Sequence, residues 1–136
     1  KFLSGHHDTV CGFAVTSSPE LAEKLSLVGR TLGNFASPFD SWLAFRGIQT
    51  LPVRMEKHAS NALAAATFLE SHPRVQQVFY PGLPSHPSYK LMQKQTTGAG
   101  GVLSFLLKDD GAEKVLNGGM LICCAESLGG TTSLIT

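Results

Sequence analysis

The chain has 136 residues, of which 43% are hydrophobic, so it is long enough for one domain with a modest core and too apolar to be disordered. Only 15% of the residues are charged, against roughly 25% in a typical soluble domain. The formal net charge is +1 and the basic residues are scattered, which excludes the basic patch of a nucleic-acid-binding protein. A small free domain should carry more charge, so we expect protein to cover part of this surface.

The same sequence excludes a membrane span and a disulfide scaffold. No stretch approaches the roughly 20 apolar residues that a spanning helix needs. The chain has three cysteines, an odd number, and they form no CxxC motif: Cys11, Cys123 and Cys124. This predicts buried thiols in a reducing, cytoplasmic setting. The first residue is Lys1, and no signal-peptide pattern follows it, so we expect a segment of a longer chain.

The first part of the chain predicts one strand followed by a helix. Residues 9–16 are rich in strand-forming side chains and mostly apolar, which is typical of a strand buried on both faces. Ser17-Ser18-Pro19-Glu20 predicts a helix start, with a serine cap, a proline in the first turn and an early acidic residue. This helix should end near Arg30. Three of its apolar side chains should be buried: Leu21, Leu25 and Val28.

Two more helices should follow. Ser37-Pro38 predicts the start of a short helix whose apolar side is formed by Phe39, Trp42, Leu43 and Phe45. Thr50 can cap the longest helix, which tolerates Pro52 in its first turn and ends before Pro73. Its apolar residues recur at steps of three and four and so share one face: Leu51, Met55, Ala59, Ala62, Ala66 and Leu69.

Beyond Pro73 the pattern changes to short alternating elements. We predict strands over residues 75–80, 101–107 and 120–125, and helices over residues 85–95 and 112–117. The whole is an α/β chain. The long helix should join the end of one domain, residues 1–47, to a smaller α+β domain, residues 48–136.

Three short segments carry candidate chemistry, each with a structural alternative. Gly5-His6-His7-Asp8 resembles a metal cluster, but adjacent histidines in an extended chain point apart, so we expect a turn and no metal site. The glycine-rich residues 98–101 precede a strand, which favours close backbone packing over phosphate binding. Glu126-Ser127-Leu128-Gly129-Gly130 follows a strand. Its hydroxyl and glycine N–H groups suit a carboxylate ligand, and the alternative is a plain turn.

Taken together, these segments resemble a known family. Lys1-Phe2-Leu3-Ser4-Gly5-His6-His7-Asp8 matches the K-[FY]-x-x-G-H-x-D segment of the Cys/Met-metabolism enzymes, which depend on pyridoxal 5'-phosphate (PLP). The further matching segments follow in the same order along the whole chain: residues 37–43, 46–51, 54–58, 61–62, 72–75, 80–87, Gln95, 98–101, 104–105 and 125–130. Members include cystathionine γ-synthase, cystathionine γ-lyase, cystathionine β-lyase and methionine γ-lyase.

The resemblance implies the fold type I, aspartate aminotransferase-like architecture of PLP enzymes. Residues 1–47 would end the large cofactor-binding domain, and residues 48–136 would form the linking helix and most of the small C-terminal domain. It also implies a homotetramer built as a dimer of dimers. The remaining cofactor ligands would lie before Lys1, and an arginine for the substrate carboxylate would lie after Thr136, so we expect the isolated segment to be inactive.

The resemblance also implies residue roles. Lys1 would form the Schiff base with PLP and then move protons between substrate carbons. Ser127 would help to hold the carboxylate of a small amino-acid substrate and steer the lysine amine. Glu126 would meet a distal amino group, which favours a γ-synthase or γ-lyase acting on cystathionine, cysteine or homoserine esters. A β-lyase, a methionine γ-lyase and an O-acetylhomoserine sulfhydrylase are the alternatives.

Overall fold

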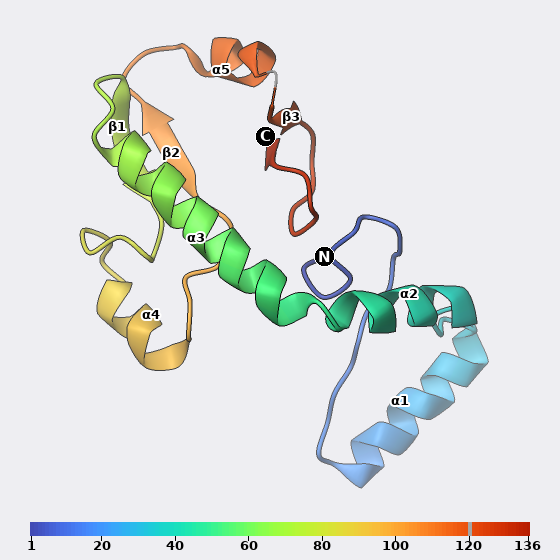
Figure 1. Ribbon diagram of the computed structural model, residues 1–136. Coiled ribbons are helices and arrows are strands. Elements are labelled where there is room, and N and C mark those ends of the chain that lie inside the picture. Colours follow the sequence, from blue (N-terminus) through green and yellow to red (C-terminus); the bar gives the residue numbers. More distant parts are fainter. Residues whose placement is uncertain (120) are drawn as a thin grey trace.

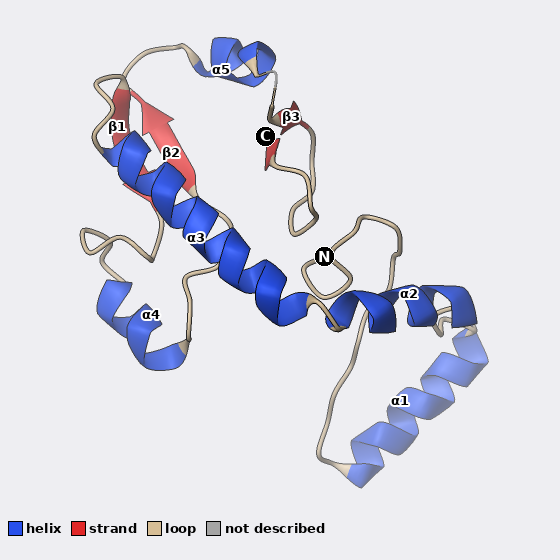
Figure 2. Cartoon of the chain, viewed as in Figure 1, coloured by secondary structure: helices blue, strands red, loops and turns tan. Residues whose placement is uncertain are grey.

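The structure is a computed structural model that describes residues 1–119 and 121–136 (Figure 1). It contains five helices and four short strands within this part of the chain. They are, in order, α1 (Pro19–Leu32), α2 (Pro38–Ile48), α3 (Leu51–Glu70), β1 (Val75–Phe79), α4 (Tyr89–Gln95), β2 (Ser104–Leu107), α5 (Ala112–Gly118), β3 (Cys123–Cys124) and β4 (Leu134–Ile135). Helices and long loops dominate the chain (Figure 2). No helix among the described residues is long and apolar enough to cross a membrane.

The predicted starts of the first two helices are confirmed. The Ser18 hydroxyl accepts a hydrogen bond from the Leu21 amide at 3.3 Å, and proline follows the cap. The Ser37 hydroxyl accepts one from the Asp40 amide at 3.0 Å in the same way. Each helix therefore begins where a side-chain oxygen satisfies an amide that has no partner within the helix.

The predicted strand over residues 9–16 is wrong for this chain. The segment is an unpaired loop, with Val10 93% and Val15 95% exposed. A strand buried on both faces needs neighbours on each side, and the described residues supply none to this segment.

The predicted burial of the α1 side chains is also wrong. Leu21, Leu25 and Val28 remain 48%, 42% and 50% exposed. The apolar side of α2 is similarly open, with Phe39 65% and Phe45 66% exposed. Nothing among the described residues covers these apolar side chains.

Helix α3 and the residues packed on it form the core. The six residues predicted to share a face are buried or half-buried, with Ala62 at 6% and Ala66 at 0% exposure. Tyr80 and Leu83, at 1% and 2% exposure, pack against these alanines. The Tyr80 hydroxyl donates to the Gly100 carbonyl at 2.9 Å, and burial raises the pKa of its phenol. A small-residue helix face thus receives one large aromatic side chain.

The second half holds two small sheets. Strands β1 and β2 pair antiparallel, with Val78 opposite Phe105 and a bulge between Val75 and Gln77. The side chains of β2 alternate between two environments, because Phe105 and Leu107 are half-buried while Ser104 and Leu106 are exposed. Strands β3 and β4 pair in parallel over two residues each, and β4 was not predicted.

Three predicted elements are shorter than expected. Strand β2 begins at Ser104 and not at residue 101. Helix α4 begins at Tyr89 and not at residue 85, because successive three-residue turns occupy the preceding proline-containing segment. The strand predicted over residues 120–125 is reduced to Cys123–Cys124, and Met120 lies outside the described residues. All three cysteines are free. Cys123 and Cys124 are exposed and Cys11 is half-buried, so the prediction of buried thiols is wrong for this chain.

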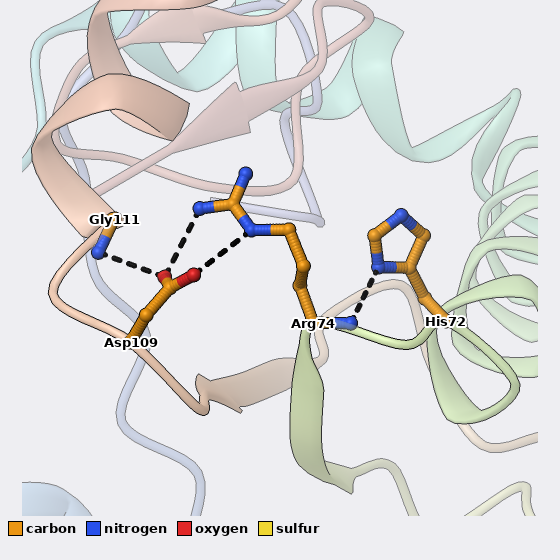
Figure 3. Close-up of polar contacts among 4 residues, drawn as sticks. All are labelled: His72, Arg74, Asp109 and Gly111. Carbon is orange, nitrogen blue, oxygen red and sulfur yellow. Dashed lines mark hydrogen bonds and ion pairs between the residues drawn. The ribbon is translucent and has the colours of Figure 1, made fainter.

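A two-point ion pair joins the end of β2 to the start of β1 (Figure 3). Arg74 donates from Nε and Nη2 to the two carboxylate oxygens of Asp109, both at 3.0 Å. Asp109 also accepts from the Gly111 amide at 3.0 Å, immediately before α5. The Arg74 bonds, followed by the charge of its guanidinium, are the main reason that the pKa of Asp109 lies below its usual value of 3.8.

We predict that Asp109→Asn removes a pH-dependent part of the stability. Because the folded state lowers the pKa of Asp109, the pair stabilises the fold above the unfolded pKa and loses this contribution as pH falls through the folded pKa. The unfolding free energy of Asp109→Asn should therefore lie below that of the parent at neutral pH, and the two should converge in acid. Urea denaturation across this pH range measures the difference. Asp110→Asn is the control, and an identical convergence there would contradict the assignment to Asp109.

Candidate functional site

The first site segment is a tight turn that begins at Lys1. The Gly5 amide donates to the Lys1 carbonyl at 2.9 Å, and the Ser4 hydroxyl lies 3.4 Å from the same oxygen. Gly5 takes a φ of 71°, a value that glycine adopts without strain. The Lys1 side chain is exposed, and among the described residues it has neither a hydrogen bond nor an ion pair. The turn fixes the lysine backbone and leaves its amine free.

Arg54, near the start of α3, binds the backbone of the lysine turn. Its guanidinium donates to the carbonyls of Phe2 at 2.9 Å and Leu3 at 3.3 Å. It also donates to the Gly47 carbonyl at 2.7 Å and to the Thr50 hydroxyl at 3.0 Å. The Thr50 hydroxyl therefore accepts a hydrogen bond from Arg54. It makes no side-chain capping bond to α3, contrary to its predicted role. One side chain joins the lysine turn to the α2–α3 junction.

Two glycines allow this close contact. A Cβ atom at Gly5 would overlap the Arg54 guanidinium, and one at Gly47 would lie 2.7 Å from the carbonyl carbon of Ser4. Both positions are buried. The match of Gly5 and Gly47 to the expected motifs thus has a packing reason in this structure.

His58 lies one helical turn after Arg54 in α3 and packs against the lysine turn. Its ring meets the ring of Phe2 edge-on, with centroids 5.4 Å apart and planes at 78°. A Cβ at Gly101 would lie 2.8 Å from the His58 Cβ. The glycine-rich segment before β2 therefore packs closely on α3 at Gly101, which confirms the packing interpretation at this position, whereas Gly100 faces open space. The buried Nε2 of His58 has no hydrogen-bond partner among the described residues.

The second site segment, residues 126–130, lies against the lysine turn. A Cβ at Gly129 would lie 2.7 Å from the Phe2 backbone nitrogen, and one at Gly130 would overlap the imidazole of His7. Figure 1 shows this red loop beside the N-terminus, although the two segments stand at opposite ends of the sequence. Ser127 is half-buried with a φ of 156°, which is rare outside glycine. Glu126 is exposed.

The structure therefore places the three predicted site residues on two touching segments. It does not gather the histidines of the same turn into a metal site. His6 contacts the Ser4 carbonyl at 2.7 Å, and His7 lies on Gly130. No group of three or more potential metal ligands occurs in the described part of the chain.

Asp40 fixes a third segment near the site. Its carboxylate accepts from the Ser37 and Thr9 hydroxyls, both at 2.7 Å, and these bonds lower its pKa, with Ser37 contributing most. This network ties the loop after the lysine turn to the start of α2.

Sequence reasoning missed the roles of Arg54 and His58. Their only sequence signals were their match to the family pattern and their spacing of four residues on a helix.

Comparisons with known proteins agree with this arrangement. A family model described as "Cys/Met metabolism PLP-dependent enzyme" matches residues 1–136. Cystathionine γ-lyase from Rattus norvegicus is 47% identical over 136 residues, which is 98% of this chain and 34% of that protein. Cystathionine β-lyase from Coxiella burnetii is 47% identical over 138 residues, or 99% and 36% of the two chains.

A solved structure shows the same fold. Cystathionine γ-synthase from Xanthomonas oryzae pv. oryzae, in complex with aminoacrylate and cysteine, aligns with a TM-score of 0.93 at 40% identity. The alignment covers 98% of this chain and 35% of that one. The chain thus spans about a third of the length of the relatives that it matches. With this coverage and the ordered motifs that begin at Lys1, the chain belongs to the Cys/Met-metabolism family of PLP-dependent enzymes.

Proposed function

We propose that this chain supplies the cofactor-anchoring lysine and part of the substrate-binding surface of a trans-sulfuration enzyme. The parent protein is of the cystathionine γ-synthase or γ-lyase type and acts by β- or γ-elimination or replacement on sulfur amino acids or homoserine esters. One observation carries the proposal: Gly129 packs on the backbone of Phe2, so the Ser127 loop lies directly beside Lys1. Two segments with the expected chemistry meet in a chain of this family.

The residues present fit PLP. Lys1 offers an exposed primary amine on a fixed backbone, which is the group that binds an aldehyde covalently. No ion pair with another described residue holds this amine away from a ligand. When bound, PLP withdraws electrons from the substrate carbon atoms that react.

The chain's own residues then have separate roles. The Lys1 Nζ takes a proton from one substrate carbon and returns it to another, as a base and then as an acid. Lysine suits this work because its amine loses its proton readily when it is desolvated. The turn closed by the Gly5 amide holds the Lys1 backbone while the side chain moves. Ser127, half-buried on the facing loop, donates its hydroxyl to the substrate carboxylate.

Glu126 sets the proposed preference among substrates. Its exposed carboxylate precedes Ser127 and meets a distal ammonium group, such as that of cystathionine. This favours the γ-synthase and γ-lyase activities over a β-lyase. The β-lyase, methionine γ-lyase and O-acetylhomoserine sulfhydrylase activities are the alternatives within the family.

The surface of the chain supports an assembled enzyme. Residues 1–47 are proposed to end the large cofactor-binding domain, and residues 48–136 to form the linking helix and most of the small domain. The exposed apolar side chains of α1 and α2 would then lie against the rest of the large domain or a neighbouring subunit of a homotetramer. Free cysteines fit a cytoplasmic protein.

Borohydride reduction of the full-length, PLP-loaded protein tests the proposal. Reduction fixes the cofactor to the lysine that carries it, and peptide mapping should find the pyridoxyl label on Lys1. The 136-residue chain alone should take up no stoichiometric label, since it spans only about a third of the length of its relatives. A label on Lys24, Lys57 or any lysine other than Lys1 would refute the assignment.

A further inference from the structure

We propose that Arg54 is a positioning residue that sets the place of the Lys1 amine and links it to helix α3. This inference rests on the proposed function of Lys1. Arg54 touches neither substrate nor cofactor in this proposal. It acts through the backbone of the turn that carries the lysine.

The hydrogen bonds of Arg54 are the first reason. Its guanidinium makes four bonds and none of them is to a carboxylate. Two go to the carbonyls of Phe2 and Leu3, the residues that follow Lys1. An arginine used only for charge pairing would meet an acidic partner, whereas this one uses its planar fork to fix backbone oxygens.

The second reason is that the bonds of Arg54 connect two separate parts of the chain. The other two acceptors, Gly47 and Thr50, belong to the junction between α2 and α3. Figure 1 shows the first turn of α3 directly beside the N-terminal loop. A displacement of α3 relative to the lysine turn therefore requires that bonds on one side of this guanidinium break. The lysine and the long helix move together.

The packing around Phe2 is the third reason. Its carbonyl is held by Arg54, its ring by the edge of His58, and its backbone nitrogen faces Gly129. Phe2 is adjacent to Lys1 and contacts the loop of Ser127. A shift of Phe2 would therefore change the separation between the lysine amine and the substrate-binding loop at once.

The replacement Arg54→Lys in the full-length holoenzyme tests this role. A lysine ammonium cannot bridge four acceptors arranged around a planar fork. We expect kcat to fall by about 10- to 100-fold, since a misplacement of about 1 Å can cost 10²-fold. KM should stay within about 2-fold, because the substrate-binding groups are retained.

Two readouts separate positioning from a merely structural role. The visible circular dichroism of bound PLP should change, because it reports the geometry of the lysine linkage. The Gly5 amide should exchange hydrogen faster, because its turn loosens. The matched control is Arg74→Lys, which breaks another arginine pairing far from Lys1 and should leave both readouts at parent values.

A second variant perturbs the same contact from the other side. Gly5→Ala places a Cβ where the guanidinium lies and also strains the backbone at a φ of 71°, so it should lower kcat at least as far as Arg54→Lys does. The loss in the double variant should be smaller than the two single losses combined, because the Arg54 contact can be removed only once. This gives a result even if Arg54→Lys folds poorly.

The possible results are distinct. If Arg54→Lys lowers thermal stability alone and leaves kcat, dichroism and exchange unchanged, Arg54 is only structural and the inference is wrong. Additive losses in the double variant would also overturn it. A borohydride label on another lysine in the parent protein would instead refute the proposed function, irrespective of any Arg54 result.

Discussion

Lys1→Ala in the full-length protein should lower kcat/KM by about 10³-fold or more, because one group is lost that both anchors the cofactor and moves protons. Lys1→Arg should be equally poor, since a guanidinium stays charged at neutral pH and cannot act as a base. Steady-state assays with cystathionine and with homoserine esters measure the loss. Parent-like turnover by Lys1→Ala would contradict the central role of this residue.

Lys24→Ala is the matched control for that experiment. Lys24 is an exposed lysine whose ion pair, at 2.6 Å, is with Glu20 on the same helix. A surface pair of this kind contributes at most about 1 kcal/mol to stability. Its loss should leave kcat/KM at the parent value. A fall in kcat/KM for Lys24→Ala would show that removal of any lysine charge lowers the activity.

Tyr80→Ala should destabilise the fold by about 3–5 kcal/mol, as expected for removal of a buried aromatic ring. Tyr80 is the largest fully buried side chain among the described residues and packs on the alanines of α3. Its removal leaves a cavity between α3 and the segments around β1 and β2. Urea denaturation followed by far-UV circular dichroism measures the change.

Two further tyrosine variants separate the parts of this effect. Tyr80→Phe keeps the ring but removes the donor to the Gly100 carbonyl, and should cost about 1–2 kcal/mol. Tyr89→Phe, on the half-buried side of α4, should change stability by less than about 0.5 kcal/mol. A loss below about 1 kcal/mol for Tyr80→Ala would contradict the position of this ring at the centre of the core.

The helices were predictable because their signals are local. The Ser18 and Ser37 caps act within three residues, and the face of α3 repeats over its full length. The strand at residues 9–16 was predicted wrongly, because a strand depends on partners and none is present in the described chain. Burial of the α1 side chains was predicted wrongly for the same reason.

The sequence predicted which residues carry the chemistry of the candidate site, but not the contacts that hold those residues together. Lys1 and Ser127 were identified by their resemblance to family motifs, and the structure brings their segments together. Nothing local in the sequence shows that Arg54 meets the carbonyls of Phe2 and Leu3, because such a contact exists only after the chain has folded. The same holds for the contact of Gly129 with Phe2.

The contact between Gly129 and Phe2 has a consequence for the order of folding. Helix α3 forms from local contacts, and strands β1 and β2 pair residues such as Phe79 and Ser104 across a loop much shorter than the chain, so these elements should form early. Gly129 and Phe2 close a loop of nearly the whole chain, which has a greater entropic cost. During refolding, we therefore expect secondary structure to return first and cofactor binding to be among the last properties recovered.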